Sequence, residues 1–281
     1  MKLLIIGGGA AGASCATRFR RLNEQAQITI LERTDEVSIA NCGLPYYISG
    51  VIKNRDNILV SNPQKFKSWF NIDVKLKTEV IQINKEEKHV ITNTGERISY
   101  DYLVIATGAT PIVPNFEGLN KDKTFVVRSL ADADKIKAYI KENNIQNVAI
   151  IGGGFIGVEV AENMIEMGLK TSLIEMNNQI LSPLDPEMIQ LAHKEMFAKG
   201  IDLILSEGHI QSTFLKSPVT YDLTCLSDSC YLRMRKGILV GVSAIVTPAY
   251  YPALMHYDTA NRHLAKRIGF SCLPLCFLHV F

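Results

Sequence analysis

The residue best suited to redox chemistry is Cys42, which lies in the segment SIANCGLPYY at residues 38–47. Pro45 can occupy the first turn of a helix, and Cys42 would then lie just before the amino terminus of that helix. A thiolate is stabilised at such a position and its pKa is lowered, which makes it a nucleophile. A small buried cysteine that serves only packing is the alternative, because a tight Asn-Cys-Gly turn does not require sulfur. The spacing alone leaves both interpretations open.

No second cysteine lies within a few residues of Cys42, so an internal dithiol pair is not available there. Cys42 could therefore cycle only as a mixed disulfide with an external thiol, or as a sulfenic acid formed with peroxide. Cys15 is a poorer candidate, because together with Phe19 and Leu22 it marks the apolar face of a helix. We expect Cys15 in the core.

The opposite face of that first helix carries two guanidinium groups and a hydroxyl. Ser14, Arg18 and Arg21 recur at positions i, i+4 and i+7, so their side chains share one face. The face could be a solvated basic stripe, which is the ordinary fate of such residues. It could also bind a thiol substrate that is rich in phosphate.

A short apolar run leads into the glycine-rich sequence GGGAAG at residues 7–12, and a second apolar run ends in Glu32. This pattern predicts a βαβ unit of the dinucleotide-binding type. Gly7 permits the tight turn, Gly9 lets the backbone approach a pyrophosphate, and Gly12 lets the helix pack closely on the strand. The phosphates would lie at the amino terminus of the helix. Glu32 is placed to accept a hydrogen bond from a ribose hydroxyl.

The same pattern returns in GGGFIG at residues 152–157, where the following apolar run ends in Glu175. Two complete units in one chain predict two nucleotide sites. Two sites in series are reasonable if one holds a flavin and the other brings a nicotinamide that delivers a hydride to it. The carboxylate of Glu175 would repel a 2′-phosphate, and residues 176–179 supply no Arg or Lys. NADH is therefore favoured over NADPH.

The region between the two glycine sequences favours β-structure. Residues 78–108 alternate apolar and polar side chains around a Thr94-Gly95 turn, which is typical of a β-meander. Thr107-Gly108 then break a buried strand at a place where the backbone could approach a cofactor. Residues 109–120 are expected to form a linker. The predicted fold class is α/β, with two Rossmann-like three-layer dinucleotide-binding domains, the first of them incomplete, and an irregular tail.

The composition is that of an ordinary globular protein. The chain has 281 residues, a formal net charge of +2 and 47% hydrophobic residues, which argues against disorder and against a nucleic-acid surface. The sparse cysteines favour a reducing cytoplasm. Residues 1–16 resemble a signal peptide, but a strand-glycine-helix unit explains more of these residues. Residues 237–255 are long enough for a membrane helix, but the prolines in this segment weaken that interpretation. No metal site is expected, because the tail cysteines lack zinc spacing; they are Cys225, Cys230, Cys272 and Cys276.

With both glycine sequences and SIANCGLPYYISG at residues 38–50, the chain resembles the flavoprotein pyridine nucleotide-disulfide oxidoreductases. Within them it resembles the single-cysteine branch of coenzyme A-disulfide reductases and related NADH oxidases, peroxidases and polysulfide reductases. The match runs through about residue 210. The resemblance implies FAD on the first unit, NAD(P)H on the second, and Cys42 as a redox-active nucleophile that cycles through a cysteine–coenzyme A mixed disulfide. It also implies a homodimer.

The resemblance gives roles to particular residues. Lys53 and Glu159 resemble a Lys/Glu pair that lies beside the flavin ring, where a cation can stabilise reduced flavin; a solvated helix face is the alternative for Glu159. Phe70 stands where related reductases can carry a Lys. Coenzyme A would contact Ser14, Arg18, Arg21, Ser38 and Asn41. The residues expected to hold the cofactors are Gly7, Gly9, Ala10, Ala11, Gly12, Glu32, Arg33, Ala106, Thr107 and Gly108 in the first half, and Gly152, Gly154, Phe155, Ile156, Gly157 and Glu175 in the second.

The sequence changes character near residue 215. No Ala-x-Gly-Asp flavin motif follows, and only residues 257–269 resemble, faintly, part of the family's dimerisation domain. We therefore expect the first part of an FAD-binding domain at 1–112, an NAD(P)H-binding domain at 113–215 and an unassigned tail at 216–281. A truncated or frameshifted chain that binds flavin poorly is expected.

The predicted activity is electron transfer from NAD(P)H through FAD to a small disulfide or persulfide, most simply coenzyme A disulfide. Two alternatives stay open. An NADH oxidase or peroxidase would use the sulfenic acid of Cys42. A non-catalytic nucleotide-binding remnant would follow from the missing flavin motif.

Overall fold

The computed structural model describes residues 1–113, 119–205 and 237–241, and these residues fall into two compact units. Residues 1–40 and 59–109 belong to the first unit, whereas residues 41–58 belong to the second unit together with the described residues from 110 to 241. The tail cysteines, residues 257–269 and most of residues 237–255 lie outside the described residues.

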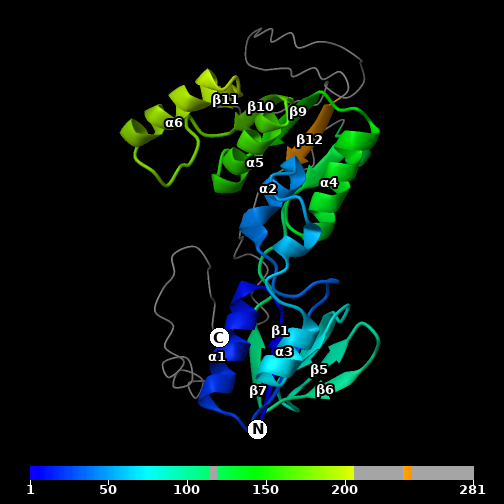
Figure 1. Ribbon diagram of the computed structural model, residues 1–281. Coiled ribbons are helices and arrows are strands. Elements are labelled where there is room, and N and C mark those ends of the chain that lie inside the picture. Colours follow the sequence, from blue (N-terminus) through cyan, green and yellow to red (C-terminus); the bar gives the residue numbers. More distant parts are fainter. Residues whose placement is uncertain (114–118, 206–236, 242–281) are drawn as a thin grey trace. The chain divides into compact units, whose positions relative to one another are not determined.

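The first unit is built on a parallel sheet in which the strand order is β3-β2-β1-β7. Figure 1 labels the strands β1 and β7 of this sheet and the helices α1 and α3 of the same unit. Its central strand β1 pairs in parallel with β2 and with β7. A separate antiparallel sheet has the order β4-β5-β6. The elements of this unit are β1 (Lys2–Ile6), α1 (Ala10–Leu22), β2 (Gln27–Leu31), α3 (Pro63–Phe70), β3 (Ile72–Lys75), β4 (Val80–Asn84), β5 (His89–Thr92), β6 (Arg97–Ser99) and β7 (Tyr102–Ile105).

Alternate residues of β1 face two different cores, as the period of two along a strand requires. Leu3 and Ile5 pack with residues of α1 and α3 in one cluster. Leu4 and Ile6 pack with Val90 and other residues of the antiparallel sheet in a second cluster. The parallel sheet is therefore covered by helices on one face and by β4–β6 on the other. The predicted β-meander is confirmed for β4–β6, whereas β7 joins the parallel sheet.

The second unit contains a five-stranded parallel sheet with the order β11-β10-β9-β12-β8. Its core includes Val148, Ala149 and Ile150 of β9, which are fully buried. The elements of this unit are α2 (Leu44–Ser49), β8 (Thr124–Val126), α4 (Leu130–Glu142), β9 (Asn147–Ile151), α5 (Phe155–Glu166), β10 (Lys170–Glu175), α6 (Pro186–Ala198), β11 (Asp202–Leu205) and β12 (Gly237–Gly241), with short 3₁₀ turns at Asn41–Gly43, Arg55–Ile58 and Lys121–Lys123.

Two parts of this arrangement differ from the predicted boundaries. Residues 41–58 were expected in the first domain, but α2 packs against α4 and α5 of the second unit. The strand β12 lies in the predicted tail, yet it pairs in parallel with both β9 and β8. Its sequence GILVG is a short apolar run, which is typical of a strand in a parallel sheet. The division at residue 215 therefore does not hold for these five residues.

Among the described residues, no helix is long and apolar enough to cross a membrane.

Candidate functional site

The first glycine turn connects β1 to α1 and is held by close backbone contacts. Gly7 has a φ of 101°, and its N–H donates to the carbonyl of Leu31 at 2.8 Å. A Cβ atom on Gly7 would lie 2.2 Å from the carbonyl oxygen of Ala106, and a Cβ on Gly12 would lie 1.9 Å from the carbonyl oxygen of Gly7. Both neighbours are backbone atoms that cannot move cheaply. Glycine is therefore required at these two positions.

Gly9 is different, because a Cβ atom there would meet nothing within 4 Å. It is the amino-terminal cap of α1, and no side chain accepts a hydrogen bond from the first turn of that helix. Ala10 and Ala11, which follow it, are exposed and half-buried. This open space beside unsatisfied N–H groups fits a pyrophosphate, because the helix dipole and the free donors both favour negative charge.

Glu32 at the end of β2 is bound to the same turn. Its Oε2 accepts a hydrogen bond from the N–H of Gly8 at 2.7 Å, and its Oε1 accepts from both the N–H and the hydroxyl of Thr34 at 2.9 Å. A Cβ atom on Gly8 would lie 2.5 Å from Cγ2 of Val37. Gly8 was not among the predicted site residues, although its place between Gly7 and Gly9 suggests it. Arg33, beside Glu32, is exposed.

The Ala-Thr-Gly segment at residues 106–108 lies beside the first turn. The N–H of Ala106 donates to the carbonyl of Ile6 at 2.8 Å, which places the backbone of residues 106 and 107 against Gly7. Thr107 and Gly108 are exposed, and Gly108 has a φ of 69°. This backbone at the carboxyl edge of the sheet is open to a ligand.

The second glycine turn has the same construction between β9 and α5. Gly152 has a φ of 106°, and its N–H donates to the carbonyl of Ile174 at 2.8 Å. A Cβ atom on Gly157 would lie 1.9 Å from the carbonyl oxygen of Gly152, whereas a Cβ on Gly154 would meet nothing within 4 Å. The next residues, Phe155 and Ile156, are exposed. This turn fits a second pyrophosphate for the same reasons as the first.

Glu175 at the end of β10 takes the place that Glu32 has in the first turn. Its Oε2 accepts a hydrogen bond from the N–H of Gly153 at 2.6 Å, and its Oε1 accepts from the N–H and from Nδ2 of Asn177 at 2.9 Å. Both carboxylate oxygens therefore face N–H donors. The negative charge is held at the edge of the turn, next to the exposed side chain of Met176.

Cys42 is exposed and lies in the 3₁₀ turn that precedes α2, and Pro45 is in the first turn of that helix. The packing alternative for Cys42 is therefore wrong. Cys15 is buried as expected, and burial raises the pKa of its thiol to about 11. The predicted apolar face is correct for Phe19, but Leu22 is 52% exposed because it is the last residue of α1.

The predicted substrate residues of the first unit lie on α1 and beside the first turn. Ser14, Arg18 and Arg21 are exposed on α1, so the shared face is confirmed as a surface. Ser38 has a φ of 56°, and its N–H donates to the carbonyl of Gly8 at 2.8 Å. Asn41 is exposed and belongs to the second unit.

A neighbouring arginine that the sequence analysis missed is structural. Arg20 is buried, and its guanidinium donates to the carbonyl oxygens of Phe70, Asn71 and Glu24 at 2.6–2.8 Å. It therefore joins the carboxyl-terminal ends of α1 and α3. No local pattern distinguishes it from Arg18 or Arg21.

Glu159 on α5 is half-buried, and burial together with the charge of Glu162 raises its pKa. Lys53 is exposed, and no ion pair joins it to Glu159 within the part of the chain that the structure describes. Burial and the charges of Glu159, Glu162 and Cys42 raise the pKa of the Tyr46 phenol. Tyr46 was not among the predicted site residues.

The family model for pyridine nucleotide-disulphide oxidoreductases matches residues 1–213. The chain belongs to this family. Members of the pyridine nucleotide-disulphide oxidoreductase family bind FAD and NAD(P)H, and both glycine turns have the open third glycine that such ligands need.

The curated relatives of this family member include an NADH oxidase of Methanocaldococcus jannaschii, 36% identical over 74% of this chain and 47% of the relative. They also include a coenzyme A disulfide reductase of Staphylococcus aureus, 38% identical over 73% of this chain and 48% of the relative. The chain thus spans about half the length of the curated relatives it matches.

Among solved structures, the reduced CoADR-RHD protein of Bacillus anthracis matches with a TM-score of 0.78 and 38% identity, over 89% of this chain and 44% of the other. An NAD-dependent persulfide reductase from A. fulgidus matches with a TM-score of 0.75 and 30% identity, over 96% of this chain and 48% of the other. The α/β fold with parallel sheets is therefore that of the nucleotide-binding region of flavoprotein reductases.

Proposed function

We propose that this chain carries the nucleotide-binding part of an NADH-dependent disulfide reductase in which Cys42 reacts with coenzyme A disulfide. The observation that carries the proposal is the exposed Cys42, which stands alone at the start of α2 in a chain with two open glycine turns. An exposed thiol has the access that a nucleophile needs.

The two turns divide the cofactors between them. FAD would lie on the first turn, held by Gly9, Ala10, Ala11, Glu32 and the backbone at residues 106–108, with Arg33 beside it. NADH would lie on the second turn, held by the backbone at residues 154–157 and by Glu175. The fixed carboxylate of Glu175 supports NADH over NADPH, because it would repel a 2′-phosphate. When bound, FAD supplies a two-electron relay between NADH and the disulfide at Cys42.

Cys42 performs the thiol chemistry. Its thiolate attacks one sulfur of coenzyme A disulfide, forms a cysteine–coenzyme A mixed disulfide and releases the first coenzyme A as a thiolate. Two electrons from NADH and one proton then cleave the mixed disulfide, which releases the second coenzyme A as a thiol and restores the Cys42 thiolate. No second cysteine is needed. Lys53 and Glu159 are proposed to lie beside the flavin ring.

Ser14, Arg18, Arg21, Ser38 and Asn41 are proposed to contact coenzyme A. The exposed basic face of α1 supports this, because two guanidinium groups on one face suit a ligand with several phosphates. Relatives named coenzyme A disulfide reductase and persulfide reductase agree with a substrate of this kind.

Mass spectrometry of the purified chain after exposure to coenzyme A disulfide tests the proposal without requiring turnover. We expect one coenzyme A adduct on the peptide that contains Cys42, and none on the peptide that contains the buried Cys15. The Cys42→Ser variant should lose the adduct and all NADH-dependent disulfide reduction, whereas Cys15→Ala should keep both. Undiminished disulfide reduction by Cys42→Ser would remove Cys42 from the mechanism.

A relative named NADH oxidase supports a second candidate, in which Cys42 cycles as a sulfenic acid with oxygen or peroxide. Trapping the oxidised thiol with dimedone during NADH turnover separates the two, because only the second candidate gives a dimedone adduct at Cys42. The amount of flavin bound to the purified protein tests the expectation that this chain binds flavin poorly. A colourless protein that still binds NADH would favour a non-catalytic nucleotide-binding module.

A further inference from the structure

The helix that follows Cys42 cannot be stable by itself. α2 has only six residues, and isolated helices shorter than about 12–15 residues are marginal in water. Leu44, Pro45, Tyr47 and Ile48 of α2 are buried, and α2 packs against α4 and α5 within the second unit. The geometry of the Cys42 turn therefore depends on how firmly α2 is attached to those two helices.

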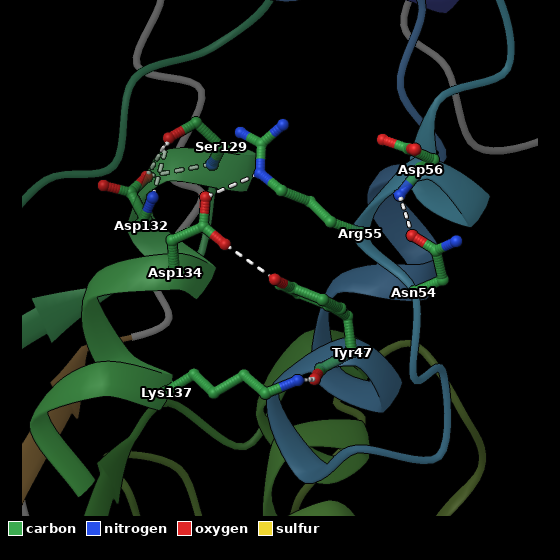
Figure 2. Close-up of polar contacts among 8 residues, drawn as sticks. All are labelled: Tyr47, Asn54, Arg55, Asp56, Ser129, Asp132, Asp134 and Lys137. Carbon is green, nitrogen blue, oxygen red and sulfur yellow. Dashed lines mark hydrogen bonds and ion pairs between the residues drawn. The ribbon is translucent and has the colours of Figure 1, made fainter. Parts of the chain in front are cut away.

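Asp134 on α4 binds this segment at two points, as Figure 2 shows. One carboxylate oxygen accepts a hydrogen bond from the phenol of Tyr47 at 2.8 Å. The other accepts from Nε of Arg55 at 2.9 Å. Burial and the hydrogen bond to Asp134 raise the pKa of Tyr47, so its phenol stays protonated and remains a donor. A single carboxylate thus ties both α2 and the 3₁₀ turn after it to α4.

Lys137, one turn further along α4, binds Tyr47 in two ways. Its ammonium donates a hydrogen bond to the carbonyl of Tyr47 at 3.1 Å, and it lies 4.2 Å from the centre of the Tyr47 ring (Figure 2). The carbonyl belongs to the last turn of α2, where a cation interacts favourably with the helix dipole. Tyr47 is therefore fixed at its hydroxyl, its ring face and its carbonyl by two residues of one helix.

A second attachment joins α2 to α5. The hydroxyl of Ser49 donates to Oδ1 of Asn163 at 2.6 Å, and Nδ2 of Asn163 donates to the carbonyl of Glu159 at 2.8 Å. Asn163 is buried, so this bond is shielded from water. It holds only the end of α2, whereas Asp134 holds residues on both sides of the loop at residues 50–54.

We propose that Asp134 is a positioning residue for Cys42, which fixes residues 44–58 on α4 through Tyr47 and Arg55 and thereby holds the reactive thiol in its place on the second unit. This rests on the proposed function in that Cys42 is taken as the reactive thiol. Hydrogen bonds to charged groups in a partly buried site are strong enough for this role.

The test compares Asp134→Ala with Asp132→Ala in the full chain. Asp132 lies on the same turn of α4 as Asp134, but its carboxylate caps that helix by accepting hydrogen bonds from the N–H and hydroxyl of Ser129 (Figure 2). Loss of the Asp132 cap weakens the first turn of α4 but removes no hydrogen bond to residues 44–58. Tyr47→Phe is the milder variant, because it removes a single hydroxyl.

Hydrogen–deuterium exchange followed by mass spectrometry is the direct measurement. For residues 44–58 we expect exchange to be at least about tenfold faster in Asp134→Ala, and a smaller increase in Tyr47→Phe. In Asp132→Ala the faster exchange should be confined to the start of α4. Exchange of residues 44–58 that is unchanged in Asp134→Ala, or equally fast in Asp132→Ala, would overturn the proposal.

A kinetic measurement then separates positioning from general damage. With FAD added, kcat/KM for the disulfide should fall about tenfold in Asp134→Ala, while NADH-dependent reduction of ferricyanide stays unchanged, because that acceptor takes electrons without Cys42. An equal loss of both activities would count against positioning. The exchange measurement does not depend on turnover. If Cys42→Ser kept full disulfide reduction, the proposed function would be rejected, and the exchange measurement would still show whether Asp134 holds residues 44–58.

Discussion

The turn at residues 7–12 and the turn at residues 152–157 have the same internal contacts. In each, the first glycine has a positive φ and the last glycine touches its carbonyl oxygen, while the third glycine is open. In each, an acidic residue from the next strand accepts a hydrogen bond from the middle glycine. The two glycine turns of this chain therefore share the same backbone contacts.

The helices that follow the two turns carry different side chains at equivalent positions. Counted from the last glycine of each turn, α1 has Ser14, Arg18 and Arg21 where α5 has Glu159, Asn163 and Glu166. On α1 this face is exposed and basic, whereas on α5 Asn163 is buried and bonded to Ser49 of α2. The turn therefore sets where a nucleotide can lie, and the helix face decides what else the unit contacts.

The largest effect should come from the last glycine of either turn. Gly12→Ala and Gly157→Ala would each place a Cβ atom 1.9 Å from a carbonyl oxygen of the backbone. We expect each to lower the free energy of unfolding of its own unit by at least about 3 kcal/mol, because the helix must move away from its strand. Urea denaturation combined with limited proteolysis shows which unit opens. Wild-type stability in either variant would mean that the turn relaxes at low cost.

The third glycine should show the reverse behaviour. Gly9→Ala and Gly154→Ala add a methyl group in open space, so the cost in stability should not exceed about 1 kcal/mol. That methyl group stands where a pyrophosphate would approach, and we expect affinity to fall by about ten- to a hundredfold. Gly9→Ala should lose flavin and keep NADH affinity, and Gly154→Ala should do the opposite. Loss of the same ligand in both variants would contradict the division of cofactors.

The residue after each acid offers a further test. Met176 follows Glu175, whereas a basic residue, Arg33, follows Glu32. The double variant Glu175→Ala, Met176→Arg removes the carboxylate that repels a 2′-phosphate and adds a donor for it. We expect the ratio of the Kd values for NADH and NADPH to move about tenfold toward NADPH. Glu32→Ala serves as the control and should leave that ratio unchanged. An equal shift in Glu32→Ala would contradict the proposal that the nicotinamide nucleotide binds at the second turn.

The smallest effect concerns the charge on α5. Burial and Glu162 raise the pKa of Glu159 above its ordinary value of 4.5, so the folded chain disfavours the ionised carboxylate. Glu159→Gln should therefore raise stability at pH 7, by no more than about 0.5 kcal/mol. The gain should shrink as the pH falls through the raised pKa and vanish below 4.5, where the carboxyl is protonated in both the folded and unfolded states. A gain that persists at pH 3.5 would point to a cause other than charge.

The glycine turns could be predicted because their requirements are local. A positive φ and contacts between backbone atoms leave glycine as the only residue that fits Gly7 or Gly12, so the sequence itself shows the geometry. The burial of Cys15 followed in the same way from the apolar spacing on one helix. Glu32 and Glu175 were also predicted as site residues, but their hydrogen bonds to the N–H groups of Gly8 and Gly153 were not predicted.

Contacts between distant residues could not be predicted. Tyr47 and Asp134 are 87 residues apart, and neither belongs to a pattern that specifies the other. Arg20 differs from Arg18 and Arg21 only in its direction from α1, which placed it under the carbonyl groups of α3. The apolar run that forms β12 was visible in the sequence, but the position of that strand between β9 and β8 is a property of the whole sheet.

The position of β12 also bears on how the chain folds during synthesis. Within the described sheet, β8 is bonded to β12 and to no other strand, and β12 is separated from β8 by the chain between Val126 and Gly237. A ribosome would therefore release β9, β10 and β11 while the outermost strand still lacks its neighbour. Contacts between residues this far apart in the sequence form slowly, so the pairing of β8 with β12 is expected to be a late step in the folding of this sheet.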